Sequence, residues 1–340
     1  MEKIYIKTTE SCNLQCKHCY IGDYRKETRF FDENKTISWL FSYFNTHSIN
    51  EEDILFSFHG GEPFLCDLSK MEKVTKAFPK AQFDATSNLM ILTPNHIDFI
   101  KKYFVNKATG RPFIKTSWDY AIRFSDENQK LIWENNVKQL LANDIDVKVI
   151  TCLTTELLEN VSPKSYCQYM KRLGITYVDF ERLTDNTTEN KSLIPSYKTI
   201  DTWLTDVYKI KLLNVGMFTN MAQAISGNHI ACRKRQCMSN VLTINADGTV
   251  GGCPNTAKQN YFYTIEGEEI IEQRNSLIVK ESIRHTECYT CDLYGYCNGS
   301  CHQLSWQGTV CPEPKQLWRH IIYDMDMEKE TKTQLLIDGI

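Results

Sequence analysis

Three cysteines lie close together near the start of the chain, in the stretch "CNLQCKHCY" that spans 12–20. Cys12, Cys16 and Cys19 follow a short segment, "KIYIKTT", whose β-branched and aromatic residues predict a strand. Three thiolates can hold three irons of a four-iron cluster and leave the fourth iron free for another ligand. A zinc site that borrows His18 as its fourth ligand is the less favoured alternative, because zinc ligands usually come as two spaced pairs.

A second group of cysteines fills the last third of the chain. The segment "CMSNVLTINADGTVGGC" carries Cys237 and Cys253, and the Asp247-Gly248 pair between them is typical of a hairpin turn. Eight thiolates can ligate two four-iron clusters with four each. Two structural zinc sites stay open as an alternative, because CX2C pairs also suit zinc ribbons. The eight cysteines of this group are Cys232, Cys237, Cys253, Cys288, Cys291, Cys297, Cys301 and Cys311.

The composition limits where the protein acts and what it binds. The 340-residue chain has a formal net charge of -3, so we expect no nucleic-acid partner. No segment is apolar over the length that a membrane-spanning helix needs, and the start, "MEKIYIKTTE", carries no apolar signal region. We therefore expect a cytoplasmic protein without membrane contact. Fourteen cysteines in that reducing compartment predict metal ligands or redox groups rather than disulfides.

Strand-like and helix-like segments alternate through the first half of the sequence. The strand candidates are short and rich in β-branched or aromatic residues, and helical patterns separate them. Six repeats of strand and helix predict a parallel sheet with helices outside it. The strand candidates are 3–9, 53–58, 82–87, 113–118, 147–153 and 175–181, and the helix candidates are 37–44, 68–78, 94–104, 129–141, 165–173 and 197–213.

Two further features concern packing. The segment "PEPKQLWRHIIYDM" begins with helix-initiating prolines and predicts a closing helix packed on the core. Its apolar face carries Leu317, Trp318, Ile321, Ile322 and Met325. The three cysteines outside the two groups, Cys66, Cys152 and Cys167, are interpreted as small buried residues.

These motifs resemble those of the radical S-adenosylmethionine (SAM) enzymes, whose hallmark is the CX3CX2C spacing. The resemblance implies a partial (β/α)6 TIM-type barrel in which the open iron binds the amino and carboxylate groups of SAM. "FHGGEP" at 58–63 looks like the family's GGEP motif, so Gly60, Gly61 and Glu62 are expected to meet the methionine ammonium. Paired glycines permit close backbone approach, and a carboxylate pairs with an ammonium.

The segment "TSWDY" resembles the family's S-x-D-G segment, which makes Ser117 a candidate for SAM contacts. Tyr120 replaces the usual glycine, and the arginine often found about a turn of helix later is not evident at Gln129 or Lys130. Ser87, in the "TSN" triplet at the end of the third strand, is another candidate. His18 and Tyr20 flank Cys19 and are expected either to face the adenine or, for His18, to be exposed to solvent.

The second cysteine group resembles the SPASM extension of radical SAM enzymes. By that resemblance, auxiliary cluster I takes Cys232, Cys237, Cys253 and Cys301, and auxiliary cluster II takes Cys288, Cys291, Cys297 and Cys311. The expected cofactors are therefore three [4Fe-4S] clusters and SAM. The expected domains are a barrel at 1–196, a bridging helical segment at 197–230, the SPASM domain at 231–313 and a C-terminal helix at 314–340.

The resemblance predicts an enzyme that cleaves SAM reductively to a 5'-deoxyadenosyl radical and oxidises a side chain of a ribosomally made peptide. A small-metabolite dehydrogenase and a sulfatase-type formylglycine maturase are the alternatives. In anaerobic sulfatase maturases an aspartate follows the cysteine that here is Cys253, and Pro254 stands there instead. Asp247 and Glu181 are weaker candidates for a base. We rank an activator of a glycyl-radical enzyme, a zinc scaffold and an electron carrier lower.

The resemblance also implies partners. Many relatives carry an N-terminal module that binds the leader peptide, but only eleven residues precede Cys12. We therefore expect either that a separate leader-peptide-binding protein presents the peptide or protein substrate, or that the enzyme grips it directly. An electron donor such as flavodoxin or ferredoxin is expected as well.

Overall fold

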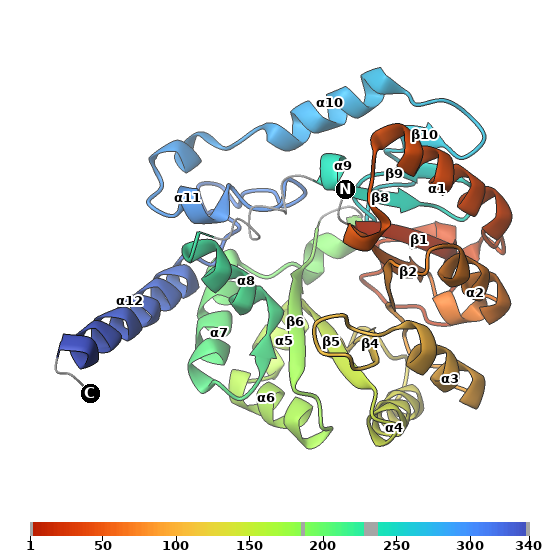
Figure 1. The fold of residues 1–340 in the computed structure, drawn as a ribbon. Coiled ribbons are helices and arrows are strands. Elements are labelled where there is room, and N and C mark those ends of the chain that lie inside the picture. Colours follow the sequence, from red (N-terminus) through yellow and green to blue (C-terminus); the bar gives the residue numbers. More distant parts are fainter. Residues whose placement is uncertain (1–2, 185–187, 228–236, 338–340) are drawn as a thin grey trace. The chain divides into compact units, whose positions relative to one another are not determined.

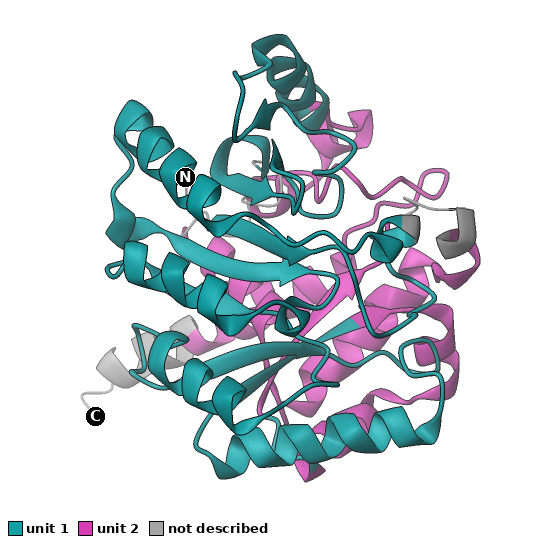
Figure 2. Ribbon diagram, turned by 90° about the vertical axis from the view of Figure 1, so that its right-hand side faces the viewer, with its two compact units in different colours: residues 1–151, 173–175, 236–282 teal, residues 152–172, 176–235, 283–340 magenta. Residues whose placement is uncertain are grey.

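The computed structural model describes residues 3–184, 188–227 and 237–337. Cys232, the first predicted auxiliary ligand, lies outside these residues. The chain divides into two compact units, each built from segments that are distant in sequence (Figure 2). Unit 1 contains residues 1–151, 173–175 and 236–282, and unit 2 contains residues 152–172, 176–235 and 283–340.

Unit 1 contains a six-stranded sheet in which the first predicted strand is central. Parallel partners pair with both edges of that strand, and the strands lie side by side in the order β10-β9-β8-β1-β2-β3. The hairpin predicted around Asp247 and Gly248 is confirmed, because β8 and β9 are antiparallel. The strands are β1 (Lys3–Thr9), β2 (Leu55–Gly60), β3 (Gln82–Ala85), β8 (Val241–Ile244), β9 (Thr249–Gly251) and β10 (Tyr263–Thr264).

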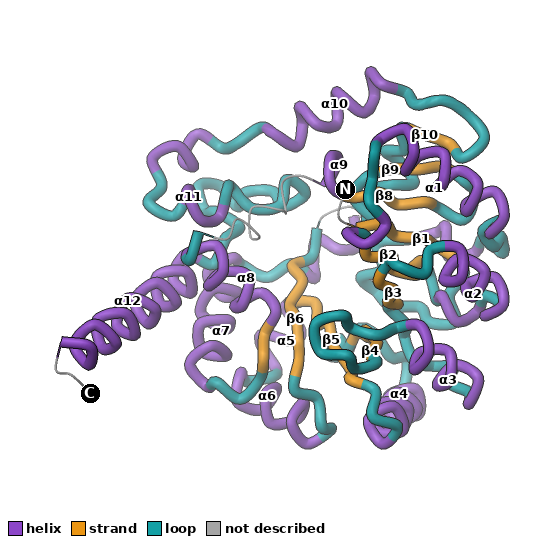
Figure 3. Tube along the Cα trace, in the orientation of Figure 1, coloured by secondary structure: helices purple, strands orange, loops and turns teal. Residues whose placement is uncertain are grey.

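Two more parallel strands of unit 1 follow β3. A backbone bridge between Thr86 and Lys115 connects the end of β3 to β4, and β4 pairs in parallel with β5. The helices predicted between these strands are all present (Figures 1 and 3). The elements are α1 (Glu33–His47), α2 (Leu68–Ala77), α3 (Pro94–Tyr103), β4 (Phe113–Ser117), α4 (Glu127–Ala142) and β5 (Asp146–Leu153).

Local sequence signals explain where these helices begin. The Asp32 carboxylate accepts hydrogen bonds from the first free backbone N–H groups of α1, and Asp67 does the same for α2. Thr93 and His96 form a reciprocal cap at the start of α3, with Pro94 at the first helical position. Each cap satisfies donors that the helix itself leaves unpaired.

The alternation of side chains along β1 separates the core from the site. Ile4 and Ile6 on β1 and Phe56 and Phe58 on β2 are completely buried. Burying a side chain of this size stabilises the fold by about 1.5–3 kcal/mol. The intervening residues of β1 point to the opposite face, where Lys7 is also buried. Charged groups on that face must therefore find partners within the protein.

Unit 2 contains a pair of parallel strands, β6 and β7, with several helices. The predicted closing helix is confirmed as α12, which packs against α7 and α8. Leu317, Trp318 and Ile321 on its inner face are buried, and Ile322 and Met325 are half-buried. The elements are α5 (Thr155–Asn160), α6 (Pro163–Arg172), β6 (Tyr177–Arg182), α7 (Tyr197–Ile210), β7 (Asn214–Val215), α8 (Gly216–Ile225), α11 (Tyr294–Cys297) and α12 (Lys315–Ile337).

The predicted α/β class with parallel strands is confirmed, and the differences are local. β2 continues through His59 and Gly60, two residues beyond the strand expected at 53–58, because Gly60 still pairs with Thr9 of β1. The sequence did not predict α5 or α10 (Ile271–Ser282), whereas α8 lies within the helical segment expected at 197–230. Among the described helices, none combines the length and the apolar character that crossing a membrane requires.

Candidate functional site

The three N-terminal cysteines lie in one loop directly after β1. Their thiols are half-buried, and none forms a disulfide. The Cys19 N–H donates to the Cys16 carbonyl (3.3 Å), and buried Leu14 anchors the start of the loop. Burial raises the pKa of the Cys12 thiol to about 11, and the charges of Glu62, Cys16 and Cys19 add to that rise. Three thiols in one loop, which itself carries no fourth cysteine, fit a [4Fe-4S] cluster with one open iron.

The paired glycines hold the end of β2 against this loop. Gly60 has a φ of +128°, and a Cβ atom there would collide with the Thr9 carbonyl. A Cβ atom on Gly61 would collide with the carbonyls of Glu10 and Ser11. The Gly61 N–H donates to the Thr9 carbonyl at 2.9 Å. The close approach that these glycines permit is therefore to the chain's own backbone.

Glu62 is buried at the carboxyl end of β2, with 1 % of its surface exposed. Its carboxylate accepts hydrogen bonds from the Phe64 N–H (3.1 Å), the Ser87 hydroxyl (2.8 Å) and the Asn88 N–H (2.6 Å). Burial raises the pKa of Glu62 to about 7, although these hydrogen bonds oppose the rise. All three of these donors are neutral, and the positive charge of Arg123 also lowers the pKa of this carboxyl.

The "TSN" triplet after β3 connects Glu62 to the cysteine loop. Ser87 is 1 % exposed, and its hydroxyl is already engaged with Glu62. The Asn88 side-chain amide donates to the Asn13 side-chain carbonyl (2.7 Å) and to the Cys12 sulfur (3.5 Å). Sequence analysis named Ser87 and missed Asn88, although its place beside Ser87 at a strand end was a usable signal.

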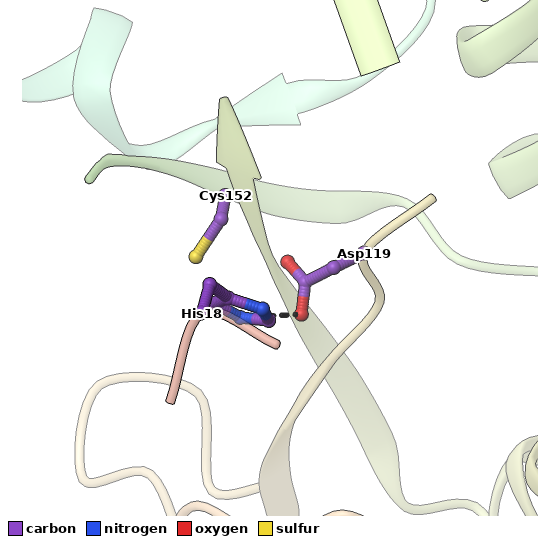
Figure 4. Close-up of side chains that lie close together, drawn as sticks. All are labelled: His18, Asp119 and Cys152. Atoms are coloured by element: carbon purple, nitrogen blue, oxygen red, sulfur yellow. Dashed lines mark ion pairs between the residues drawn. The ribbon is translucent and has the colours of Figure 1, made fainter. Parts of the chain in front are cut away.

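The segment after β4 also reaches the cysteine loop. Ser117, at the end of β4, is half-buried. His18 is not exposed to solvent: its side chain is 9 % exposed and its Nε2 lies 3.2 Å from an Asp119 carboxylate oxygen (Figure 4). That alternative for His18 was therefore wrong, because the segment after β4 covers the ring. No arginine stands at Gln129 or Lys130, but Arg123 lies nearer to the end of β4. Its Nη1 is 3.8 Å from the Cys16 sulfur.

A polar cluster surrounds the carboxyl end of β1. Lys7 and Glu10 are 3 % and 1 % exposed and form an ion pair at 3.8 Å. Burial lowers the pKa of Lys7 and raises the pKa of Glu10. Beside them, the Tyr20 hydroxyl lies 3.0 Å from Nδ1 of His59. Burial lowers the pKa of His59 to about 3, so its ring is neutral at neutral pH.

The two base candidates from the sequence occupy structural positions. Asp247 accepts hydrogen bonds from Thr249 within the hairpin turn and pairs with Lys258 at 2.7 Å. Glu181 is exposed on β6. Of the remaining cysteines, Cys66 and Cys167 are buried as expected, whereas Cys152 at the end of β5 is only half-buried.

Unit 1 also holds the first part of the second cysteine group. Cys237 opens the short helix α9 (Cys237–Asn240), and Cys253 follows β9. A hydrogen bond from Cys237 lowers the pKa of the Cys253 thiol, so the two side chains are in contact. The Glu281 carboxylate of α10 accepts from the backbone N–H groups of Cys237 (2.7 Å) and Met238 (3.1 Å). α10 therefore fixes the position of Cys237.

Four cysteines of unit 2 line a cavity at the N-terminal end of α12. Four thiols line it together with Trp306 and Trp318. Cys301 is not one of the residues that line this cavity. The four lining cysteines are Cys288, Cys291, Cys297 and Cys311, the set that the SPASM resemblance assigned to auxiliary cluster II. Four thiolates around one cavity fit a closed metal centre, either a [4Fe-4S] cluster or zinc.

Comparisons with known proteins bear on the fold. No family model and no curated protein sequence matches the chain. Among solved structures, anSMEcpe with bound AdoMet (SAM) and Cp18Cys peptide superposes with a TM-score of 0.75 at 16% identity. That match covers 98% of this chain and 99% of the other. SuiB of Streptococcus suis, bound to its precursor peptide SuiA, superposes with a TM-score of 0.60 at 12% identity and covers 89% of this chain and 72% of the other.

The fold is thus the one found in radical SAM enzymes that carry a SPASM domain. The class predicted from the CX3CX2C and GGEP motifs is confirmed at the level of the fold.

Proposed function

We propose that the protein is a radical SAM/SPASM enzyme that oxidises a side chain of a ribosomally made peptide or of a protein. The observation that carries the proposal is the three-thiol loop after β1, supported by the buried Glu62 carboxylate beside it. A reduced cluster at these thiols would supply one electron to cleave bound SAM into methionine and a 5'-deoxyadenosyl radical.

The chain's own residues position the reactants in this proposal. Cys12, Cys16 and Cys19 hold the cluster and leave one iron to SAM. In its ionised form Glu62 would accept a hydrogen bond from the amino group of SAM, and Ser87 and Asn88 orient the Glu62 carboxylate. Gly60 and Gly61 keep the motif against the cysteine loop, and Ser117 remains a candidate for a SAM contact. The ends of β1, β2, β3 and β4 thus contribute to one site.

The second cysteine group is proposed to hold two auxiliary clusters that accept an electron or bind the substrate. Cys288, Cys291, Cys297 and Cys311 line one cavity in unit 2, and Cys237 and Cys253 are in contact in unit 1. Cys232 and Cys301 complete the proposed set. A cytoplasmic location and an electron donor such as flavodoxin or ferredoxin remain part of the proposal.

A peptide substrate is favoured because both solved structures named above were determined with a bound peptide. A formylglycine maturase is the second candidate, since anSMEcpe superposes over nearly its whole length. Pro254 argues against that candidate, because a side chain without a carboxylate occupies the place of the expected base.

The test is anaerobic co-expression with the short reading frames beside the gene, followed by intact-mass analysis of each peptide. A peptide that loses two hydrogens only when Cys12, Cys16 and Cys19 are intact would support the proposal. A purified, iron-loaded protein that yields 5'-deoxyadenosine but changes no peptide would favour a small metabolite or a large protein as substrate. Failure to cleave SAM at all would contradict the proposed reaction.

A further inference from the structure

The segment that follows β4 forms hydrogen bonds with the cysteine loop at consecutive residues of both segments. The Lys17 N–H donates to the Ile122 carbonyl at 3.1 Å. The Cys16 thiol donates to the Arg123 carbonyl (3.7 Å), and Arg123 Nη1 donates to the Cys16 sulfur (3.8 Å). Once Cys16 is a metal-bound thiolate it can no longer donate, so the guanidinium contact is the one that persists.

The guanidinium is held in place from its other side. Arg123 Nε donates to an Asp119 carboxylate oxygen at 2.9 Å, and the same oxygen faces His18. The Arg123 side chain is only 11 % exposed and that of Asp119 is completely buried. A planar guanidinium can keep both contacts at once because its donors form a rigid fork.

We propose that Arg123 is a positioning residue that raises the reduction potential of the cluster on Cys12, Cys16 and Cys19 through its contact with the Cys16 sulfur. This inference rests on the proposed function, since it requires a redox-active cluster at these cysteines. It assigns to Arg123 a role in electron uptake, which precedes any step on the substrate.

The physical reason is electrostatic. Reduction adds one negative charge to the cluster, and a nearby cation stabilises the more negative state. Hydrogen bonds to cluster sulfurs, local charge and solvent exposure are the factors by which a protein sets such potentials. The small exposed fraction of Arg123 reduces screening by water. Asp119 opposes the cation in part, but the Nη1 group of Arg123 is the one that contacts the sulfur.

The test compares Arg123→Gln and Arg123→Lys with the control Arg111→Gln. Arg111 precedes β4, at the strand's other end, and is paired with Asp146 at 3.1 Å, but its side chain is 55% exposed. The full-length, anaerobically reconstituted protein is titrated with dithionite and followed by electron paramagnetic resonance. The signal that changes when SAM is added identifies the cluster with the open iron.

We expect Arg123→Gln to lower the potential by about 59 mV, a tenfold change in the reduction equilibrium for one electron. Arg123→Lys keeps the positive charge but lacks the planar set of guanidinium donors. Its potential should lie between that of Arg123→Gln and that of the wild type. Arg111→Gln should match the wild type. A wild-type potential in iron-loaded Arg123→Gln would overturn the inference. If that variant does not load iron, Arg123→Met, which also removes the charge, takes its place, and a wild-type potential in iron-loaded Arg123→Met would overturn the inference.

Failure of the proposed function gives a different result. Wild-type protein that shows no SAM-sensitive signal after reconstitution would contradict both the function and the inference. A SAM-sensitive signal with the same potential in all iron-loaded variants would contradict the role of Arg123 alone.

Discussion

The two groups of thiols differ in the number of ligands that they offer to a metal centre and in the side chains that surround them. The N-terminal loop brings three thiols beside a buried carboxylate and a network of polar groups from the neighbouring strand ends. The cavity of unit 2 is lined by four thiols and aromatic side chains. An incomplete ligand set leaves room for a reactant, and a complete set closes the metal off. Under the proposed function, the first group would be the reactive centre, and the second would store charge or support the fold.

The largest effect on activity is expected when the three thiols of the N-terminal loop are removed. Replacing Cys12, Cys16 and Cys19 together with alanine should abolish SAM cleavage, because no iron remains to bind SAM. About two thirds of the iron should stay with the other cysteines, by the count of four irons per cluster. Iron analysis and assay of 5'-deoxyadenosine check both points. Persistent 5'-deoxyadenosine production in the triple variant would show that the reactive cluster lies elsewhere.

Replacing cysteines of the four-thiol cavity in unit 2 should instead lower the iron content without abolishing SAM cleavage. Replacing Cys291 and Cys297 with alanine should remove about one third of the iron and leave SAM cleavage in place, because the cavity of unit 2 would lose two of its four ligands. Modification of the peptide should fall. If zinc rather than iron is lost, the auxiliary site is structural, and the two thiol groups differ in metal as well as in closure.

The pH dependence of SAM binding tests the carboxylate that marks the reactive site. The pKa of Glu62 is about 7, above its ordinary value of 4.5, so the free protein holds this proton up to neutral pH. The N–H groups of the SAM amino group prefer the ionised carboxylate, so affinity should rise roughly tenfold between pH 6 and pH 8 as Glu62 loses its proton. In Glu62→Gln the affinity should be weak, and this rise should be missing. An equal rise in the variant would assign the titration to another group.

The stability of the fold should change with pH in the opposite direction to the affinity for SAM. A carboxyl whose pKa is raised by folding holds more protons in the folded state, so its contribution to stability is present at low pH and is lost as pH rises from 4.5 towards 7. The loss is about 3 kcal/mol for a shift of this size. Glu62→Gln should therefore flatten this part of the stability profile, which denaturation at several pH values measures.

The smallest of these effects concerns the junction of β2 with the cysteine loop. Gly61→Ala places a Cβ atom against backbone carbonyls that cannot move easily, so unfolding free energy should fall by about 1–3 kcal/mol. Gly295→Ala in α11 is the matched control, because a Cβ atom there meets no heavy atom within 4 Å. Thermal unfolding of both variants measures the difference. Equal melting temperatures would show that the backbone beside Gly61 moves enough to accommodate the added Cβ atom.

The sequence predicted the alternation of strands and helices because each element carries its own signals. Apolar residues alternate along β1, Asp32 and Thr93 lie where helices begin, and Asp247-Gly248 forms the hairpin turn. The ligand candidates were also readable, because cysteine spacing is a local property. The sequence did not show that β8 pairs with the free edge of β1, since pairing between strands so distant in sequence depends on the whole sheet.

By itself, the sequence determined the chemical types that are present: thiols in two groups, a GGEP motif and a parallel α/β pattern. Only the tertiary structure decided which groups meet. Arg123 contacts Cys16, Asn88 connects Glu62 to the cysteine loop, and Glu281 holds Cys237. The reason is physical, because local propensity acts over a few residues, whereas these contacts form where the ends of separate strands and helices are packed together.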